Sequence, residues 1–332
     1  MVAINGTVTV LIPTYNRADY LRETILSVLS QTWSAVDVLV LDDASTDETP
    51  AVVGSFAENP RVRGIRHEKN VGMAGNWKAG VAAVRGDFFI LLNDDDLLEP
   101  EFVESLVQPL LANPDLILAF CDHNVIDGKG RLLAEMTREL SERHHRTELA
   151  TGVLTDFGTA AVLHRSLHIS CTLFRTAMTP ADFLDEQAGG FACGWLFYQC
   201  YRTGYGAWYV NRRLSNYRVH PGNMLQNHRW ENYLANGQIY WLHRMLADDL
   251  PEPLASRVRT QVADIFSSYA AAWLTTGERV RAAALFAESF ALRKNAKALG
   301  GLFLCRLGST GTSLMPLLRR FKREHVRAVG HA

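Results

Sequence analysis

The chain has 332 residues, of which 48% are hydrophobic and 21% charged, and its formal net charge is −1. This ordinary composition excludes a strongly basic nucleic-acid-binding protein, and the length allows one large domain or two smaller ones. The N-terminus enters a predicted strand without a signal-like apolar core, and no run of about 18 apolar residues predicts a membrane span. The five cysteines are scattered without metal-type spacing. They predict reduced thiols and a cytoplasmic location.

The N-terminal half alternates predicted strands with predicted helices. Apolar and β-branched runs predict buried strands at residues 7–12, 36–41, 62–67, 86–92 and 116–122. We expect Pro13 to end the first strand, Asp19 to cap the helix that follows, and Ser45 and Thr46 to cap the next helix. Strands and helices in this alternation predict an α/β fold with a doubly wound, mostly parallel sheet.

Three consecutive carboxylates, Asp94 to Asp96, follow the apolar run 88–92. In open α/β sheets, ligands bind at the carboxyl ends of the strands, where these acids are predicted to lie. Adjacent carboxylates repel one another, and a hard divalent cation that also holds phosphate oxygens would relieve the repulsion. The alternative is a turn with solvated acids, in which Asp96 begins or caps the next helix.

Several further motifs surround these acids in a fixed order. They are Pro13-Thr14-Tyr15-Asn16-Arg17, Ser30-Gln31-Thr32, Leu41 to Asp47, Asn70-Val71-Gly72, Gly86-Asp87 and Asn93 to Asp96. In this order and spacing the chain resembles a family 2 glycosyltransferase of the GT-A fold over roughly residues 7 to 223. The resemblance implies sugar transfer from a nucleotide-diphosphate donor, usually with inversion at the anomeric carbon. It predicts a catalytic GT-A domain at 1–223 and a helical domain at 224–332.

The resemblance also implies which residues bind the donor. It assigns the nucleoside to Pro13, Tyr15 and Arg17, and the region of the diphosphate to Asn70 and Lys78. Asp43 matches the acid that accepts the imide N–H of uracil, so the implied donor is a UDP-sugar, or a dTDP-sugar with the same base edge. The structural alternatives are a loop aromatic for Tyr15, a turn acid for Asp43 and a solvated lysine for Lys78.

The same resemblance places a metal at the acid motif, which takes the part of the family's DXD motif. Asn93 occupies the first acid position, Asp94 falls where the ribose is held, and Asp95 falls where Mg²⁺ or Mn²⁺ is bound. His220, in the motif 217–223, matches a histidine near the metal and diphosphate. The alternative for His220 is a loop histidine packed under Pro221.

The pattern breaks at the general base. The family acid that takes a proton from the acceptor falls on Cys193-Gly194, and neither residue is a carboxylate. Asp185 or Glu186 is expected to supply the base from a shifted turn. Two other accounts stay open: an acceptor that needs little deprotonation, or a donor-binding protein without efficient transfer that acts as a scaffold or regulator.

The remaining segments give weaker predictions. Residues 123–165 are polar and predict a mobile loop or lid near the acceptor. The basic run 143–146 within it is expected to be a solvated face. His164 and His168 are expected to be structural histidines, with a role as metal ligand or base as the alternative. Helical spacing after residue 227 predicts three to five helices, with breaks at 251–253 and 276–277. The basic stretch 314–329 leaves weak peripheral membrane contact open. A homodimer and the acceptor (saccharide, lipid carrier, peptide or small natural product) stay open too.

Overall fold

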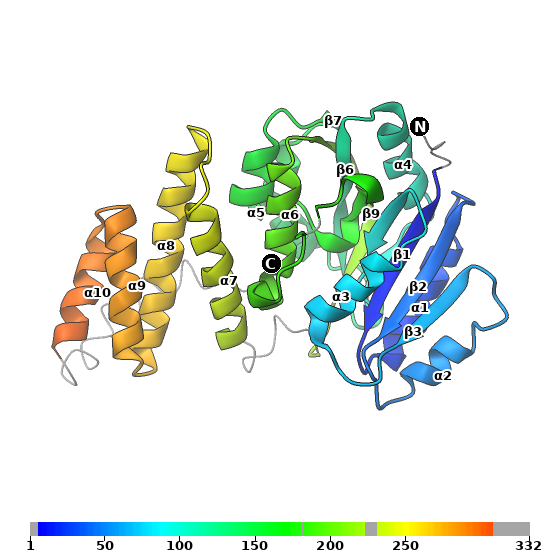
Figure 1. The fold of residues 1–332 in the computed structure, drawn as a ribbon, viewed down its shortest axis with the longest axis horizontal. Coiled ribbons are helices and arrows are strands. Elements are labelled where there is room, and N and C mark those ends of the chain that lie inside the picture. The colour runs from blue at the N-terminus through cyan, green and yellow to red at the C-terminus, as the bar shows by residue number, and fades with distance from the viewer. Residues whose placement is uncertain (1–5, 181, 223–230, 308–332) are drawn as a thin grey trace. The chain divides into compact units, whose positions relative to one another are not determined.

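The computed structural model describes residues 6–180, 182–222 and 231–307. The chain forms two compact units, Met1–Pro221 and Gly222–Ala332 (Figure 1). Within the described segments, no helix combines the length and apolar character needed to cross a membrane.

The first unit is built on one nine-stranded mixed sheet. Its strands are β1 Val8–Thr14, β2 Val36–Asp42, β3 Val62–Arg66, β4 Phe88–Leu91, β5 Leu97–Leu98, β6 Leu116–Asp127, β7 Gly152–Val153, β8 Thr172–Arg175 and β9 Gly206–Val219. They are ordered β3-β2-β1-β4-β8-β6-β9-β5, and β7 pairs with β9. The strands β3, β2, β1 and β4 are parallel, as predicted. The strand β8 is antiparallel to both of its neighbours, so the sheet is mixed beyond β4.

Helices cover both faces of this sheet (Figure 1). They are α1 Ala18–Leu29, α2 Thr49–Gly54, α3 Gly72–Ala82, α4 Phe102–Ala112, α5 Ala134–Arg143 and α6 Ala192–Arg202. Alternate residues of β1, such as Val10, belong to one core cluster with residues of α1 and α4. On the other face α3 lies so close that a Cβ at Gly80 would come within 2.2 Å of Leu41 Cδ1. The apolar runs are therefore continuous because both faces are buried.

Pro13 does not end the first strand, which continues to Thr14. The last residue pair between β1 and β4 is Leu11 with Leu91, so Pro13 lies beyond that ladder. Its missing N–H therefore costs no hydrogen bond to β4.

The predicted helix caps were wrong as well. The helix α1 begins at Ala18, which places Asp19 inside the first turn, and α2 begins only at Thr49, beyond Ser45 and Thr46.

Much of the segment 123–165, which was predicted to be a mobile loop, forms helices and strands. The strand β6 runs on to Asp127, and α5 follows. Arg146, predicted on a solvated face, is only 2% exposed, and its Nε lies 2.6 Å from Asp122 Oδ1. A buried guanidinium needs such a partner, so this arginine is part of the core.

The second unit contains the helices α7 Glu231–Leu246, α8 Leu254–Thr275, α9 Arg279–Leu292 and α10 Ala296–Arg306. The hydroxyls of Ser267 on α8 and Ser289 on α9 lie 2.7 Å apart in the buried interface. Gly301 of α10 lies against the Phe286 ring, where a Cβ would come within 2.3 Å. Small residues thus allow these helices to approach closely. The basic stretch 314–329 lies outside the described residues.

Candidate functional site

The loops after β1 and β2 are tied together by side chains at the carboxyl edge of the sheet. Asn16 has a positive φ of 54°, a conformation that asparagine tolerates better than most residues. Its N–H donates to Ser45 Oγ at 2.9 Å, and its Oδ1 accepts from the Thr46 N–H at 2.8 Å. Ser45 and Thr46 therefore join two strand ends instead of capping a helix.

Asp43 holds the start of α3. Its carboxylate is 3% exposed and accepts the N–H groups of Val71 at 2.7 Å and Gly72 at 3.0 Å. Asn70 Oδ1 also accepts from the Gly72 N–H, at 3.1 Å. A carboxylate offers about four lone-pair sites, so Asp43 retains acceptor capacity for a ligand. The neighbouring Asp42 accepts from the Ser45 N–H at 2.9 Å.

Asp96 serves the fold and caps no helix, because β5 follows it and α4 begins only at Phe102. Its carboxylate is fully buried and accepts from Ser170 Oγ at 2.7 Å, from Asn93 Nδ2 at 3.0 Å and from the Arg218 N–H at 3.0 Å. The amide of Asn93 is thus turned toward Asp96. Asn93, which was predicted to take the first acid position of the motif, therefore makes a structural hydrogen bond there.

Burial and mutual repulsion raise the pKa values of two carboxyl groups in the acid motif. Desolvation, and then the charge of Asp95, raise the pKa of Asp94 to about 7, while the Arg17 charge opposes the shift. The same two causes raise the pKa of Asp96 to about 7. A bound cation would offset the repulsion between these carboxylates, so the cluster fits a cation site.

Asp95 meets His220 across the sheet. Its Oδ2 lies 3.0 Å from His220 Nε2, and both side chains are less than a tenth exposed. The Tyr20 ring packs against the imidazole at a centroid distance of 4.7 Å. A carboxylate beside an imidazole is a suitable ligand pair for Mn²⁺ and, through oxygen, for Mg²⁺.

Arg218 is a residue of this site that was missed as a functional candidate. It is 1% exposed, and its Nε donates to the Asp95 carbonyl at 2.8 Å. Its guanidinium pairs with Glu23 at 2.7 Å and lies over the Tyr20 ring at 4.8 Å. The signal was available, because Arg218 lies at the end of β9 within the motif 217–223 that also contains His220.

Two of the predicted residues, Lys78 and Glu186, are brought together by the fold. Lys78 Nζ on α3 lies 3.5 Å from Glu186 Oε1, in the short helix Glu186–Phe191. Asp185 precedes that helix and accepts from the Gln187 N–H at 2.9 Å. An ion pair this exposed contributes under about 1 kcal/mol, so both charges are available to a ligand.

Of the other predicted residues, Pro13, Tyr15 and Arg17 lie at the carboxyl end of β1, whereas Cys193 and His164 lie in helical segments or directly after them. Pro13 and Arg17 are half-buried, and Tyr15 is 48% exposed beside them. Cys193, at the expected base position, lies in the first turn of α6, and burial raises the pKa of its thiol to about 12. His164, in turn, stacks on His145 at a centroid distance of 3.7 Å, in keeping with a structural histidine.

Residues 9–171 match the family model described as glycosyl transferase family 2. The N-terminal unit contains a family 2 glycosyltransferase domain. The sequence-based prediction of the family and of its fold is thereby confirmed. One relative, EpsH of Bacillus subtilis, is 21% identical over 238 residues, which are 70% of this chain and 67% of EpsH. An uncharacterized glycosyltransferase of Rickettsia typhi, RT0329, is 30% identical over 50% of this chain and only 49% of its own length.

Solved structures share the fold of this chain. Residues 1–349 of S. aureus TarS, in complex with UDP-GlcNAc, are 15% identical with a TM-score of 0.56, over 98% of this chain and 89% of that one. A mannosyltransferase of Pyrobaculum calidifontis, in complex with GDP-Man and Mn²⁺, is 19% identical with a TM-score of 0.56, over 99% and 88%. At identities of 15% and 19%, the similarity to these structures shows a shared fold.

Proposed function

We propose that this chain transfers a sugar, with inversion and metal assistance, from a UDP-sugar or a dTDP-sugar to an acceptor. The contact that carries the proposal is Asp95 with His220 at 3.0 Å, within a buried acid cluster at the carboxyl edge of the sheet. Asp43 and the loops that follow β1 and β2 lie at the same edge, as donor binding requires.

The uracil assignment rests on Asp43. Its buried carboxylate supports an imide contact, because only an acceptor pairs with that N–H. The bound UDP-GlcNAc of the TarS structure favours uracil, whereas the GDP-Man of the mannosyltransferase structure shows that another neighbour of the same fold holds guanine. The base preference therefore needs a direct test.

The residues present fit a divalent cation, because three adjacent carboxylates are crowded and largely buried. Asp95 and His220 would hold Mg²⁺ or Mn²⁺, with Asp94 directed to the ribose. When bound, the ion would neutralise the departing nucleotide diphosphate. A neighbour of the same fold was solved with Mn²⁺, which supports this choice.

The chain's own side chains would do the remaining work. Arg17 would bind phosphate oxygens through its planar guanidinium and Lys78 as a point charge, and Tyr15, Asn70 and Pro13 would frame the nucleoside and diphosphate. A carboxylate of the 185–186 turn would take the proton from the acceptor hydroxyl while that oxygen attacks the anomeric carbon. A single displacement of this kind inverts the configuration at that carbon.

A second candidate is a donor-binding protein without efficient transfer, acting as a scaffold or regulator. The observation in its favour is that no carboxylate stands at Cys193-Gly194 and that the Cys193 thiol has a pKa of about 12. An acceptor amine, which needs little deprotonation, would also suit the missing acid. A cytoplasmic location is part of our proposal, and it rests on the free thiols of all five cysteines.

A panel of nucleotide sugars tests these proposals. Metal-dependent donor turnover is measured with Mg²⁺ and with Mn²⁺ for the wild type, Asp95→Ala, Asp185→Ala and Glu186→Ala. Turnover of a UDP- or dTDP-sugar that requires Asp95 and one of the turn acids supports the transferase. Tight donor binding without turnover, across saccharide, lipid, peptide and small-molecule acceptors, supports the second candidate.

A further inference from the structure

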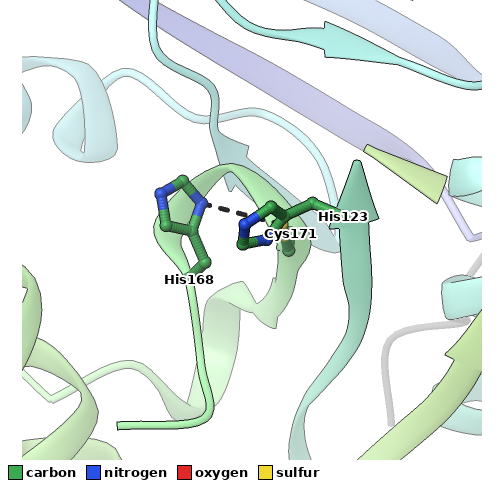
Figure 2. A group of neighbouring side chains, drawn as sticks. All are labelled: His123, His168 and Cys171. Atoms are coloured by element: carbon green, nitrogen blue, oxygen red, sulfur yellow. Dashed lines mark hydrogen bonds between the residues drawn. The ribbon is translucent and has the colours of Figure 1, made fainter. Parts of the chain in front are cut away.

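Three side chains that ligate transition metals converge outside the acid motif (Figure 2). His123 comes from β6, and His168 and Cys171 come from the segment that leads into β8. Their ligand atoms all lie within 4.8 Å of one another. The Cys171 Sγ atom is 3.6 Å from His123 Nδ1 and 3.6 Å from His168 Nδ1.

These two distances suit a shared cation. Zinc binds thiolate sulfur at about 2.3 Å and imidazole nitrogen at about 2.1 Å, so a tetrahedral angle separates sulfur from nitrogen by about 3.6 Å. Both histidines stand at this separation from one sulfur. The three atoms therefore already have the sulfur–nitrogen spacing of a zinc site.

Hydrogen bonding alone explains the cluster less well. A neutral thiol has one hydrogen, which it gives to one imidazole, and sulfur is a weak acceptor for the other. His123 is 3% exposed, and its Nε2 has no hydrogen-bond partner among the described residues. Both imidazoles face the sulfur through Nδ1, so a Zn²⁺ ion between the three atoms would replace two weak sulfur hydrogen bonds with strong ligand bonds.

We propose that His123, His168 and Cys171 form a site for Zn²⁺, distinct from the Mg²⁺ or Mn²⁺ site at Asp95. One thiolate and two imidazoles select a borderline-soft ion over Mg²⁺, which prefers oxygen ligands. Three protein ligands leave a fourth position for water or a ligand. His168 is partly exposed, which gives the ion a route to the cluster.

The proposed zinc site lies close to the acid motif in the hydrogen-bond network. Ser170, next to Cys171, donates to Asp96, and its hydroxyl accepts the Asn93 N–H at 3.2 Å. The Tyr217 ring lies 5.9 Å from the His123 ring and 5.4 Å from the His168 ring. Tyr217 precedes Arg218, whose N–H donates to Asp96. Zinc would thus fix the segment that carries Ser170 and support the position of Asp96.

The experiment uses the full chain, stripped with a chelator and then titrated with Zn²⁺, and with Co²⁺ as a spectroscopic probe. We expect one tight Zn²⁺ per chain, a tetrahedral Co²⁺ spectrum and a thiolate-to-cobalt charge-transfer band. Cys171→Ser and His168→Gln should each weaken Zn²⁺ binding at least about 100-fold, because each removes a direct ligand. Cys193→Ser and Asp95→Asn should leave it unchanged, and excess Mg²⁺ should not compete.

Equal Zn²⁺ affinity in the wild type, Cys171→Ser and His168→Gln would overturn the proposal, as would a Co²⁺ spectrum without a thiolate band. In that case the three side chains form a hydrogen-bonded network only. Circular dichroism of each stripped variant checks the fold. Because His168 is partly exposed and Cys171 is fully buried, His168→Gln provides the test even where Cys171→Ser does not fold.

Discussion

His220 Nε2 lies 3.0 Å from Asp95 Oδ2, although 125 residues separate the two in the chain. Asp95 follows β4 in the middle of the sheet, and His220 follows β9, which lies three strands further along the strand order. Arg218 fixes the relationship, since it binds the Asp95 carbonyl by its side chain and the Asp96 carboxylate by its N–H. The pair is thus held in place before any ligand arrives, as a preorganised cation site requires.

Replacing either member of this pair should remove metal-dependent turnover. We expect Asp95→Asn and His220→Gln each to lower metal-dependent kcat/KM at least about 100-fold, because a bound cation contributes several kcal/mol of charge stabilisation. Asp95→Asn preserves shape, and His220→Gln keeps a polar amide in place of the imidazole but loses the ring contact with Tyr20, so each should lower stability by about 1 kcal/mol. Steady-state kinetics over a Mn²⁺ titration, with thermal melts, measures both. Full turnover in both variants would place the metal elsewhere or show that none is needed.

Asp96 should behave differently from Asp95, because it serves the fold. In Asp96→Ala the three donors from Ser170, Asn93 and Arg218 lose a buried acceptor. We expect a loss of at least about 2 kcal/mol in the free energy of unfolding. Urea unfolding near pH 5 is the suitable measurement, since the carboxyl with its pKa of about 7 is then mostly neutral and charge repulsion does not mask the loss. The surface change Glu101→Ala is the control, and equal stability of the two variants would contradict the structural role.

The metal-free protein should become less stable as the pH rises from about 4 to about 7. Burial raises the pKa of Asp94 from 3.8 to about 7, so between these values the folded chain holds a proton that the unfolded chain has released. Stability then falls with rising pH and levels off above the folded pKa. Urea midpoints in the presence of a chelator should show this slope, and Asp94→Asn should make it shallower, with Asp96, whose pKa is also raised to about 7, supplying the rest. A slope of the opposite sign in the difference between wild type and variant would exclude a raised pKa.

The sequence predicted the strands that carry the site because their cause is local. The strand β4 is a continuous apolar run, β1 and β2 are apolar apart from Thr9, Asp37 and their polar last residues, and polar residues follow all three, which is the pattern of strands buried on both faces. The parallel pairing of these strands follows from the helices between them. The resemblance then pointed to Asp43, Asp95 and His220, which the fold gathers at one edge.

The features that the sequence did not predict depend on contacts between residues far apart in the chain. The caps were mispredicted because Ser45 and Thr46 bind Asn16, about 30 residues away, instead of the nearest helix. The antiparallel insertion of β8 leaves no periodic signal in the chain, and neither does the encounter of His123 with Cys171 over 48 residues. Charge patterning gave the wrong environment for Arg146, because a buried arginine depends on a partner that sequence spacing does not identify.

Asp43 should support both the start of α3 and the choice of base. Asp43→Asn keeps one acceptor oxygen but loses one of the bonds to the Val71 and Gly72 N–H groups, at a cost of about 1–2 kcal/mol in stability. The new amide also presents a donor to the imide, so uridine-diphosphate affinity should fall more than tenfold. Calorimetry with UDP and GDP measures the preference, with Asp47→Asn, an exposed acid of the same loop, as the control. Unchanged UDP binding would remove Asp43 from the base contact.

Glu186 is the stronger of the two candidate bases. One Asp185 oxygen accepts the Gln187 N–H, whereas the Glu186 side chain is 69% exposed. Among the described residues, its ion pair is with Lys78, at 3.5 Å. We expect Glu186→Gln to lower kcat at least about 100-fold with little change in donor affinity, and Asp185→Asn to lower it less.

Lys78→Gln distinguishes loss of the base from loss of the ion pair, because it removes the contact with Glu186 and leaves the Glu186 carboxylate in place. With Glu186 as the base, the acid limb of the pH profile of kcat disappears in Glu186→Gln and persists in Lys78→Gln. The same assay with an amine acceptor shows whether a base is needed at all, because an unprotonated amine attacks without one. Hydroxyl transfer at the wild-type rate by Glu186→Gln would rule this carboxylate out and leave Asp185→Asn as the deciding variant.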